Sequence, residues 1–140
     1  MEEKRAGDKR SGKKGVILMN NVFFFDSYAI VEIIKGNKNY EPFIRADIIT
    51  TKLNIFEVYY GLLRDVGEKE AEEFLKKYYQ FIINFDENMI RESSKFKLNN
   101  RKRNLSMVDC IGYILAKKID IKFLTGDKEF ENLPNVEFVK

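Results

Sequence analysis

The chain has 140 residues, of which 44% are hydrophobic and 34% charged, a balance that predicts one domain with its own hydrophobic core. It has no histidine and a single cysteine, which excludes Ser-His-Asp and Cys-His catalytic systems, imidazole-based metal sites, internal disulfides and thiolate metal sites. Residues 1–15 hold six of the 25 basic and three of the 22 acidic residues, so the net charge of +3 resides in that segment and residues 16–140 are formally neutral.

The hydropathy of the chain and its first residues indicate where in the cell to expect the protein. No apolar run approaches the ~20 residues of a membrane helix, and the stretch from Val16 to Met19 is too short for a secretory signal. We therefore expect a soluble, cytoplasmic protein without membrane association. Residues 1–20 are predicted to be a disordered basic tail or a non-native extension, with Met19 as a candidate natural start, and residues 21–140 to be a single domain.

Strand-like and helix-like segments alternate from Val22 onward. Short apolar runs predict strands at 22–25, 47–51, 81–85 and 121–124, and a short edge strand at 136–139. Helices are predicted at 27–35, 52–65, 68–80, after Asp86, and from a cap at Ser106 to about residue 118. Such alternation predicts an α/β protein, a three-layer α/β/α sandwich with a mainly parallel central sheet.

Four acidic residues stand where this pattern calls for apolar or small ones: Asp26, Glu57, Asp109 and Asp127. A carboxylate in an apolar run is costly unless something pairs with it. Asp26 and Asp127 lie just past the carboxyl ends of predicted strands, at the edge where parallel sheets bind ligands, and Glu57 and Asp109 are expected in the middle of helices. Four carboxylates without histidine predict a site for a hard divalent cation, Mg²⁺ or Mn²⁺.

Each of these residues also has a simpler interpretation. Asp26 fits a helix cap and Asp127 a turn, and Glu57 or Asp109 fits a buried salt bridge. A receiver-type phosphorylation switch, with Asp86 as phosphoacceptor, is a competing function for the same architecture.

A cluster of basic residues has two interpretations, contact with an RNA backbone or a solvated helix end and loop: Lys95, Lys97, Arg101, Lys102 and Arg103.

Four segments, taken together and in order, resemble the PIN-domain nucleases, and within them the VapC-type toxin ribonucleases: Phe25–Ser27, Asn54–Arg64, Leu105–Asp109 and Leu124–Phe130. The resemblance implies a PIN-like fold and Mg²⁺- or Mn²⁺-dependent hydrolysis of RNA phosphodiesters. It implies Asp26 and Asp109 as the main metal ligands, completed by Asp127 and Glu57. Hydroxyls of Ser27, Thr125 and Ser106 are supporting groups, with caps favoured for the two serines.

The same resemblance implies a small antitoxin partner and a homodimer. Two alternatives stay open at this stage. A housekeeping RNA-processing PIN nuclease would carry the same four acids, and a non-catalytic PIN-like module would bind RNA or a protein without cleaving.

Overall fold

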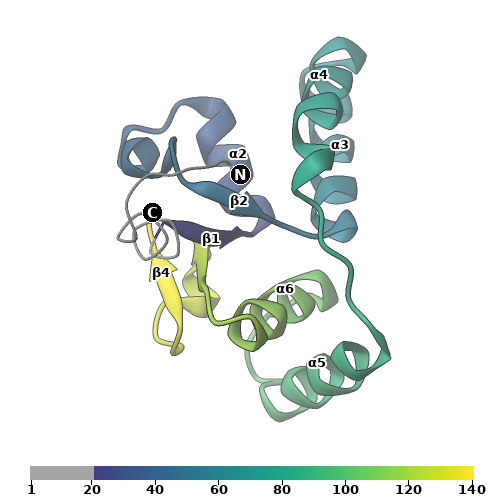
Figure 1. Cartoon of the computed structure of the whole chain (residues 1–140), viewed down its shortest axis with the longest axis vertical. Helices are drawn as coiled ribbons and strands as arrows, with labels where there is room; N and C mark the ends of the chain where they lie inside the picture. The colour runs from purple at the N-terminus through teal and green to yellow at the C-terminus, as the bar shows by residue number, and fades with distance from the viewer. Residues whose placement is uncertain (1–20) are drawn as a thin grey trace, which may run out of the picture.

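A computed structural model describes residues 21–140, so the tail predicted over residues 1–20 lies outside the described part. Four strands form one parallel sheet in the order β2-β1-β3-β4 (Figure 1). They are β1 (Val22–Phe25), β2 (Asp47–Ile49), β3 (Lys122–Thr125) and β4 (Val136–Phe138). Because every pair is parallel, the carboxyl ends of all four strands meet at one edge.

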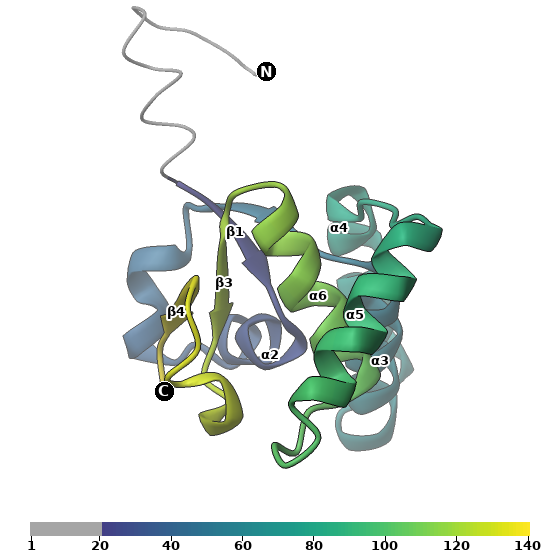
Figure 2. The same cartoon turned by 90° about the horizontal axis from the view of Figure 1, so that it is seen from below.

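Helices cover both faces of this sheet, which confirms the predicted three-layer α/β/α class. One layer contains α2 (Ser27–Lys35), the 3₁₀ helix η1 (Lys38–Phe43), α3 (Lys52–Asp65) and α4 (Glu68–Tyr78). The other contains α5 (Glu87–Asn99) and α6 (Met107–Lys118), which lie side by side in Figures 1 and 2. Two more 3₁₀ turns, η2 (Tyr79–Phe81) and η3 (Lys128–Phe130), complete the chain.

Alternation along the strands divides the core between the two layers. Phe24 of β1 stacks on Phe123 of β3 on the α6 side, with ring centroids 5.6 Å apart, whereas Phe25 packs on the α2 side. Gly112 lets α6 lie directly on the aromatic pair, because a Cβ there would be 2.7 Å from Phe24 Cε1. The backbone of α6, which carries Asp109, is therefore held close to β1 and β3.

The predicted strand at 81–85 is wrong. Only Ile82 pairs, in an isolated parallel bridge with Thr50, and Phe81 belongs to a 3₁₀ turn. The ladder stops because β2 ends at Ile49 and Thr51 already caps α3, so no further strand backbone remains to pair with. The segment from residue 82 to Asp86 instead connects the two helical layers.

The other elements are confirmed to within one or two residues. The predicted helix 68–80 ends at Tyr78, where the chain tightens into η2. Asp86 caps α5 through a bond from the Met89 amide, and since no strand precedes it, the phosphoacceptor position of a receiver domain is absent from the described fold. Within residues 21–140, no helix has the length and apolar character needed to span a membrane.

Candidate functional site

Asp26 lies at the carboxyl end of β1 and is only 3% exposed. Its Oδ1 accepts a hydrogen bond from the Ala29 amide at 3.0 Å, which makes it the N-cap of α2. Its Oδ2 accepts one from Thr125 Oγ1 at 2.7 Å, at the end of the neighbouring strand β3. The capping interpretation of Asp26 is therefore confirmed, but the cap uses only one of its two carboxylate oxygens.

Burial raises the pKa of Asp26 from 3.8 to about 7. The hydrogen bonds from Thr125 and Ala29 oppose this rise, and the negative charges of Asp109 and Asp127 add to it. The carboxylate form of Asp26 is therefore destabilised when no cation is present, because its hydrogen bonds do not compensate for the water lost on burial and the charges of Asp109 and Asp127 add to the cost.

Asp109 is the third residue of α6, in the first turn and not in the middle of the helix as expected. It forms a capping box with Ser106: the Ser106 amide donates to Asp109 Oδ2 and the Asp109 amide donates to Ser106 Oγ, both at 3.0 Å. Burial raises the pKa of Asp109, the bonds with Ser106 lower it, and the charges of Asp127 and Glu57 raise it again. Ser106 thus has the capping role predicted for it.

Asp127 follows β3 and Gly126. Its Oδ1 accepts from the Glu129 amide at 3.0 Å, while its own amide donates to Thr125 Oγ1 at 3.1 Å. The Thr125 hydroxyl therefore contacts both acids at this edge, accepting from the backbone of Asp127 and donating to the carboxylate of Asp26. The expected supporting role of Thr125 corresponds to a specific pair of bonds.

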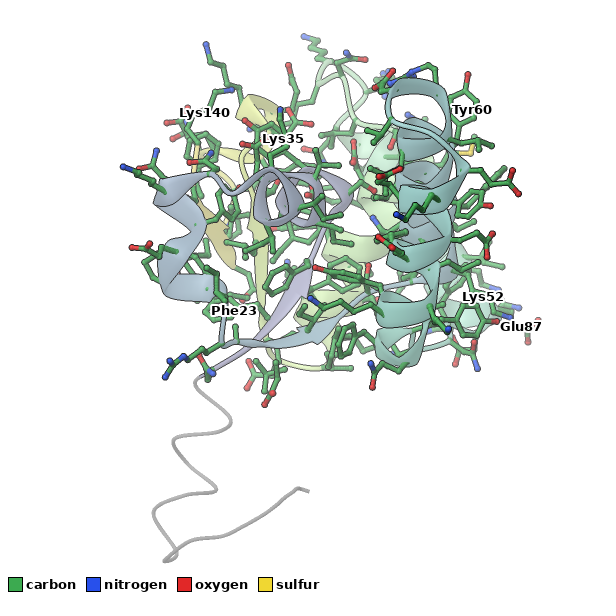
Figure 3. All side chains as sticks on the ribbon, turned by 90° about the horizontal axis from the view of Figure 1, so that it is seen from above. Phe23, Lys35, Lys52, Tyr60, Glu87 and Lys140 are labelled. Atoms are coloured by element: carbon green, nitrogen blue, oxygen red, sulfur yellow. The ribbon has the colours of Figure 1, made fainter. Side chains whose placement is uncertain are left out.

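The structure brings three of the four acids together: Asp26, Asp109 and Asp127 line one open pocket of about 350 Å³. Its remaining walls are Ser27, Tyr28, Val31 and Glu32. Figure 3 shows Lys35, Tyr60 and Lys140 at this end of the sheet and Phe23 at the opposite end.

Glu57 lies beside this pocket. It is exposed on α3, and its Oε1 accepts a 2.6 Å hydrogen bond from Ser27, which lines the pocket. None of the salt bridges within residues 21–140 involves Glu57 or Asp109, so the salt-bridge interpretation finds no support in this part of the chain.

The donor chemistry of the pocket fits a hard cation. Apart from Asp26, each acid has one carboxylate oxygen without a hydrogen bond to residues 21–140: Oδ1 of Asp109, Oδ2 of Asp127 and Oε2 of Glu57. In the described residues the acids do not close tightly enough for three of them to contact one ion directly. Like charges without a cation repel one another, so we expect the carboxylates to approach when a cation is present.

Two residues of the site were missed in the sequence. Thr51 and Asn54 are 0% and 1% exposed, and Asn54 Nδ2 donates to Ser27 Oγ at 3.0 Å. Ser27 is not a cap, since Asp26 occupies that position; its hydroxyl contacts Glu57 instead. The available signal was a polar Asn three residues before Glu57, in the stretch 53–63 that is apolar apart from these two residues, with Thr51 at the cap.

The basic cluster divides into two groups. Lys97 Nζ donates to the Leu105 carbonyl at 2.5 Å and Arg103 Nη1 to the Glu129 carbonyl at 2.7 Å, so both hold the α5–α6 loop in place. The other three side chains are exposed: Lys95, Arg101 and Lys102. Within this second group, Arg101 Nη1 also donates to the Leu98 carbonyl at 3.0 Å.

Two solved structures have the same fold. A chain of a toxin–antitoxin complex from Klebsiella pneumoniae is 18% identical with a TM-score of 0.65, over 81% of this chain and 94% of that one. The sarcin-ricin loop cleaving toxin VapC20 of Mycobacterium tuberculosis is 15% identical with a TM-score of 0.70, over 84% of this chain and 99% of that one. A search among curated proteins gave no significant match.

A family model for the PIN domain matches residues 23–136. That range runs from β1 to β4 and contains all four acids together with Thr125. Since the match covers most of the chain, the protein belongs to the PIN domain family.

Proposed function

We propose that this protein is a metal-dependent endoribonuclease and the toxin of a toxin–antitoxin pair. One observation carries the proposal: Asp26, Asp109 and Asp127, from three distant segments, line one pocket at the carboxyl edge of the sheet. The fold shared with VapC20, a toxin that cleaves the sarcin-ricin loop, supports RNA as the substrate.

The four acids are the residues that would hold the cation, Mg²⁺ or Mn²⁺. When bound, the cation supplies positive charge that lets the acids ionise together and polarises water and phosphate oxygens. Ala29 and Thr125 orient Asp26, Ser106 orients Asp109, and Ser27 orients Glu57, and the acids would approach one another when the cation binds. With a pKa of about 7, Asp26 keeps its proton on much of the metal-free protein at neutral pH and must release it to act as a ligand.

The alternative of a non-catalytic PIN-like module, which binds RNA or a protein without cleaving, is less consistent with these observations. Burying Asp26 among other acids costs stability, and within residues 21–140 no basic side chain forms a salt bridge with Asp26, Asp109 or Asp127 to offset that cost. A binding scaffold gains nothing from such an arrangement, whereas a cation site requires it.

A small antitoxin is the proposed partner, and the match to a chain of the Klebsiella pneumoniae complex supports it. An apolar groove of about 470 Å³ runs between α2 and α3 and reaches Ser27 and Glu57. Its walls include the exposed side chains of Ile34, Tyr60 and Val66. A protein segment seated there would lie next to the acids and restrict access of RNA. The homodimer remains a prediction.

The test is cleavage of a labelled structured RNA by the purified protein in Mg²⁺ or Mn²⁺, with EDTA as the metal-free control. Asp26→Asn is expected to abolish cleavage while leaving the circular dichroism spectrum unchanged. Asp120→Asn is the matched control, because Asp120 lies in a left-handed turn that asparagine also adopts. Undiminished cleavage by Asp26→Asn would contradict the site.

A second measurement separates a toxin from a housekeeping nuclease. Induced expression of the wild type in bacteria is expected to arrest growth, and expression of Asp26→Asn is not. Wild-type cleavage in vitro without growth arrest would favour the housekeeping alternative.

A further inference from the structure

A chain of hydrogen bonds leads from the interior of the protein to Glu57. Thr51 Oγ1 donates to Asn54 Oδ1 at 2.6 Å, Asn54 Nδ2 donates to Ser27 Oγ at 3.0 Å, and Ser27 Oγ donates to Glu57 Oε1 at 2.6 Å. The relay crosses from α3 to α2 and back, so it also joins these two helices, of which α2 lines the acidic pocket.

The relay has a fixed direction. An amide accepts only at its oxygen and donates only at its nitrogen. Because the Thr51 hydroxyl gives its proton to Oδ1 of Asn54, the Nδ2 group faces Ser27. Ser27 then accepts with its lone pair and has one proton left, which it donates to Glu57. The donor or acceptor role of each group therefore determines the role of the next group in the relay.

Burial makes the inner end of the relay rigid. Thr51 and Asn54 are 0% and 1% exposed, and a buried amide without partners costs about 1–3 kcal/mol. Thr51 is also the N-cap of α3, where its Oγ1 accepts from the Asn54 amide at 3.3 Å. Glu57, in contrast, is an exposed side chain. The relay ties that side chain to a fixed point of the core.

We propose that Asn54 and Thr51 are positioning residues, which act through Ser27 to hold the Glu57 carboxylate at the rim of the acidic pocket. The inference rests on the proposed function, in that Glu57 is held for cation binding and RNA cleavage. Neither Asn54 nor Thr51 lines the acidic pocket, so their effect on the reaction passes through Ser27 and Glu57.

The test uses the full chain, with Mn²⁺ affinity measured by electron paramagnetic resonance and RNA cleavage measured in parallel. Asn54→Leu keeps the branched shape and the number of heavy atoms of the side chain and removes both polar ends. Loss of such an outer-shell partner is expected to weaken Mn²⁺ binding or cleavage by about tenfold to a hundredfold. Asn88→Leu is the matched control, since Asn88 makes a comparable 2.6 Å bond to Glu92 on the surface of α5. The control is expected to stay within about twofold of the wild type.

A double-mutant cycle separates positioning from a general structural effect. In a Glu57→Ala background, Asn54→Leu is expected to have almost no further effect on Mn²⁺ affinity or cleavage. An equal loss in both backgrounds would overturn the relay. Ser27→Ala is expected to reproduce the loss and Ser27→Thr to restore most of the activity. Ser27 is partly exposed, so its variants carry the test if Asn54→Leu fails to fold.

The two proposals fail in different ways. Mn²⁺ binding that depends on Asn54, without any RNA cleavage by the wild type, would refute the nuclease and support the relay. Cleavage that is insensitive to Asn54 and Ser27 would refute the relay and support the nuclease. Absence of both Mn²⁺ binding and cleavage would refute both.

Discussion

Replacing Asp26 with asparagine is expected to stabilise the metal-free protein at alkaline pH, although the same change abolishes the proposed activity. Asp26 is 3% exposed, and its pKa rises from 3.8 to about 7 on folding. At about 1.4 kcal/mol per pH unit, the ionised carboxylate costs the folded state roughly 4 kcal/mol. Asparagine avoids this cost but loses one of two accepted hydrogen bonds, worth about 1 kcal/mol. The expected gain at pH 8 is therefore roughly 3 kcal/mol.

The gain depends on pH in a defined direction. In the unfolded chain Asp26 ionises near 3.8, while in the folded chain it keeps its proton until about pH 7. The stability that Asp26 contributes is fully present below 3.8 and is lost as the pH rises to about 7, because the folded state binds the extra proton in that range. Asparagine does not titrate, so its advantage is expected to shrink to under about 1 kcal/mol at pH 5.

Urea unfolding in EDTA at pH 5 and pH 8, followed by circular dichroism, measures both values. An Asp26→Asn effect that is equal at the two pH values, or destabilising at pH 8, would refute the reasoning. Addition of millimolar Mn²⁺ at pH 8 is expected to raise the melting temperature of the wild type only, since a ligand stabilises the state that binds it.

Three further predictions concern packing, capping and charge. Gly112→Ala is expected to cost about 1–3 kcal/mol, because its Cβ would lie 2.7 Å from Phe24; Gly61→Ala, with nothing nearer than 4.0 Å, should be neutral or slightly stabilising in thermal melts. Ser106→Ala is expected to cost about 1 kcal/mol of unfolding free energy and to slow cleavage, because Asp109 loses its capping partner; unchanged cleavage would show that the capping box does not position this acid. A variant with glutamine at Lys95, Arg101 and Lys102 is expected to bind RNA more weakly, with the melting temperature unchanged. The slope of log K against log salt concentration is expected to become shallower by about 0.7 for each phosphate contact that is lost, which RNA titrations at several salt concentrations measure.

Local chemistry determined most of the secondary structure. Short polar side chains cap α2, α3, α5 and α6, and the apolar run 22–25 forms the buried strand that it predicts. The run 81–85 has the same composition as a strand but pairs at a single position, because the partner strand beside it ends where α3 begins. A segment becomes a strand only when another strand lies beside it, and which strands are adjacent is decided by the tertiary structure.

The sequence by itself singled out the four acids as candidates, since each interrupts an apolar pattern and a buried unpaired charge requires a reason. The structure buries only Asp26 of the four, and their role in the site stays a prediction. Only the tertiary structure decided that β1 and β3 are adjacent, which brings Asp26 and Asp127 to one edge next to the first turn of α6. The relay to Glu57 also depends on the tertiary structure, although its polar members Thr51 and Asn54 stand out in the sequence. Ser27 and Asn54 are 27 residues apart in the chain, and hydrogen bonds between them require the packing of α2 against α3, which short-range patterns do not encode.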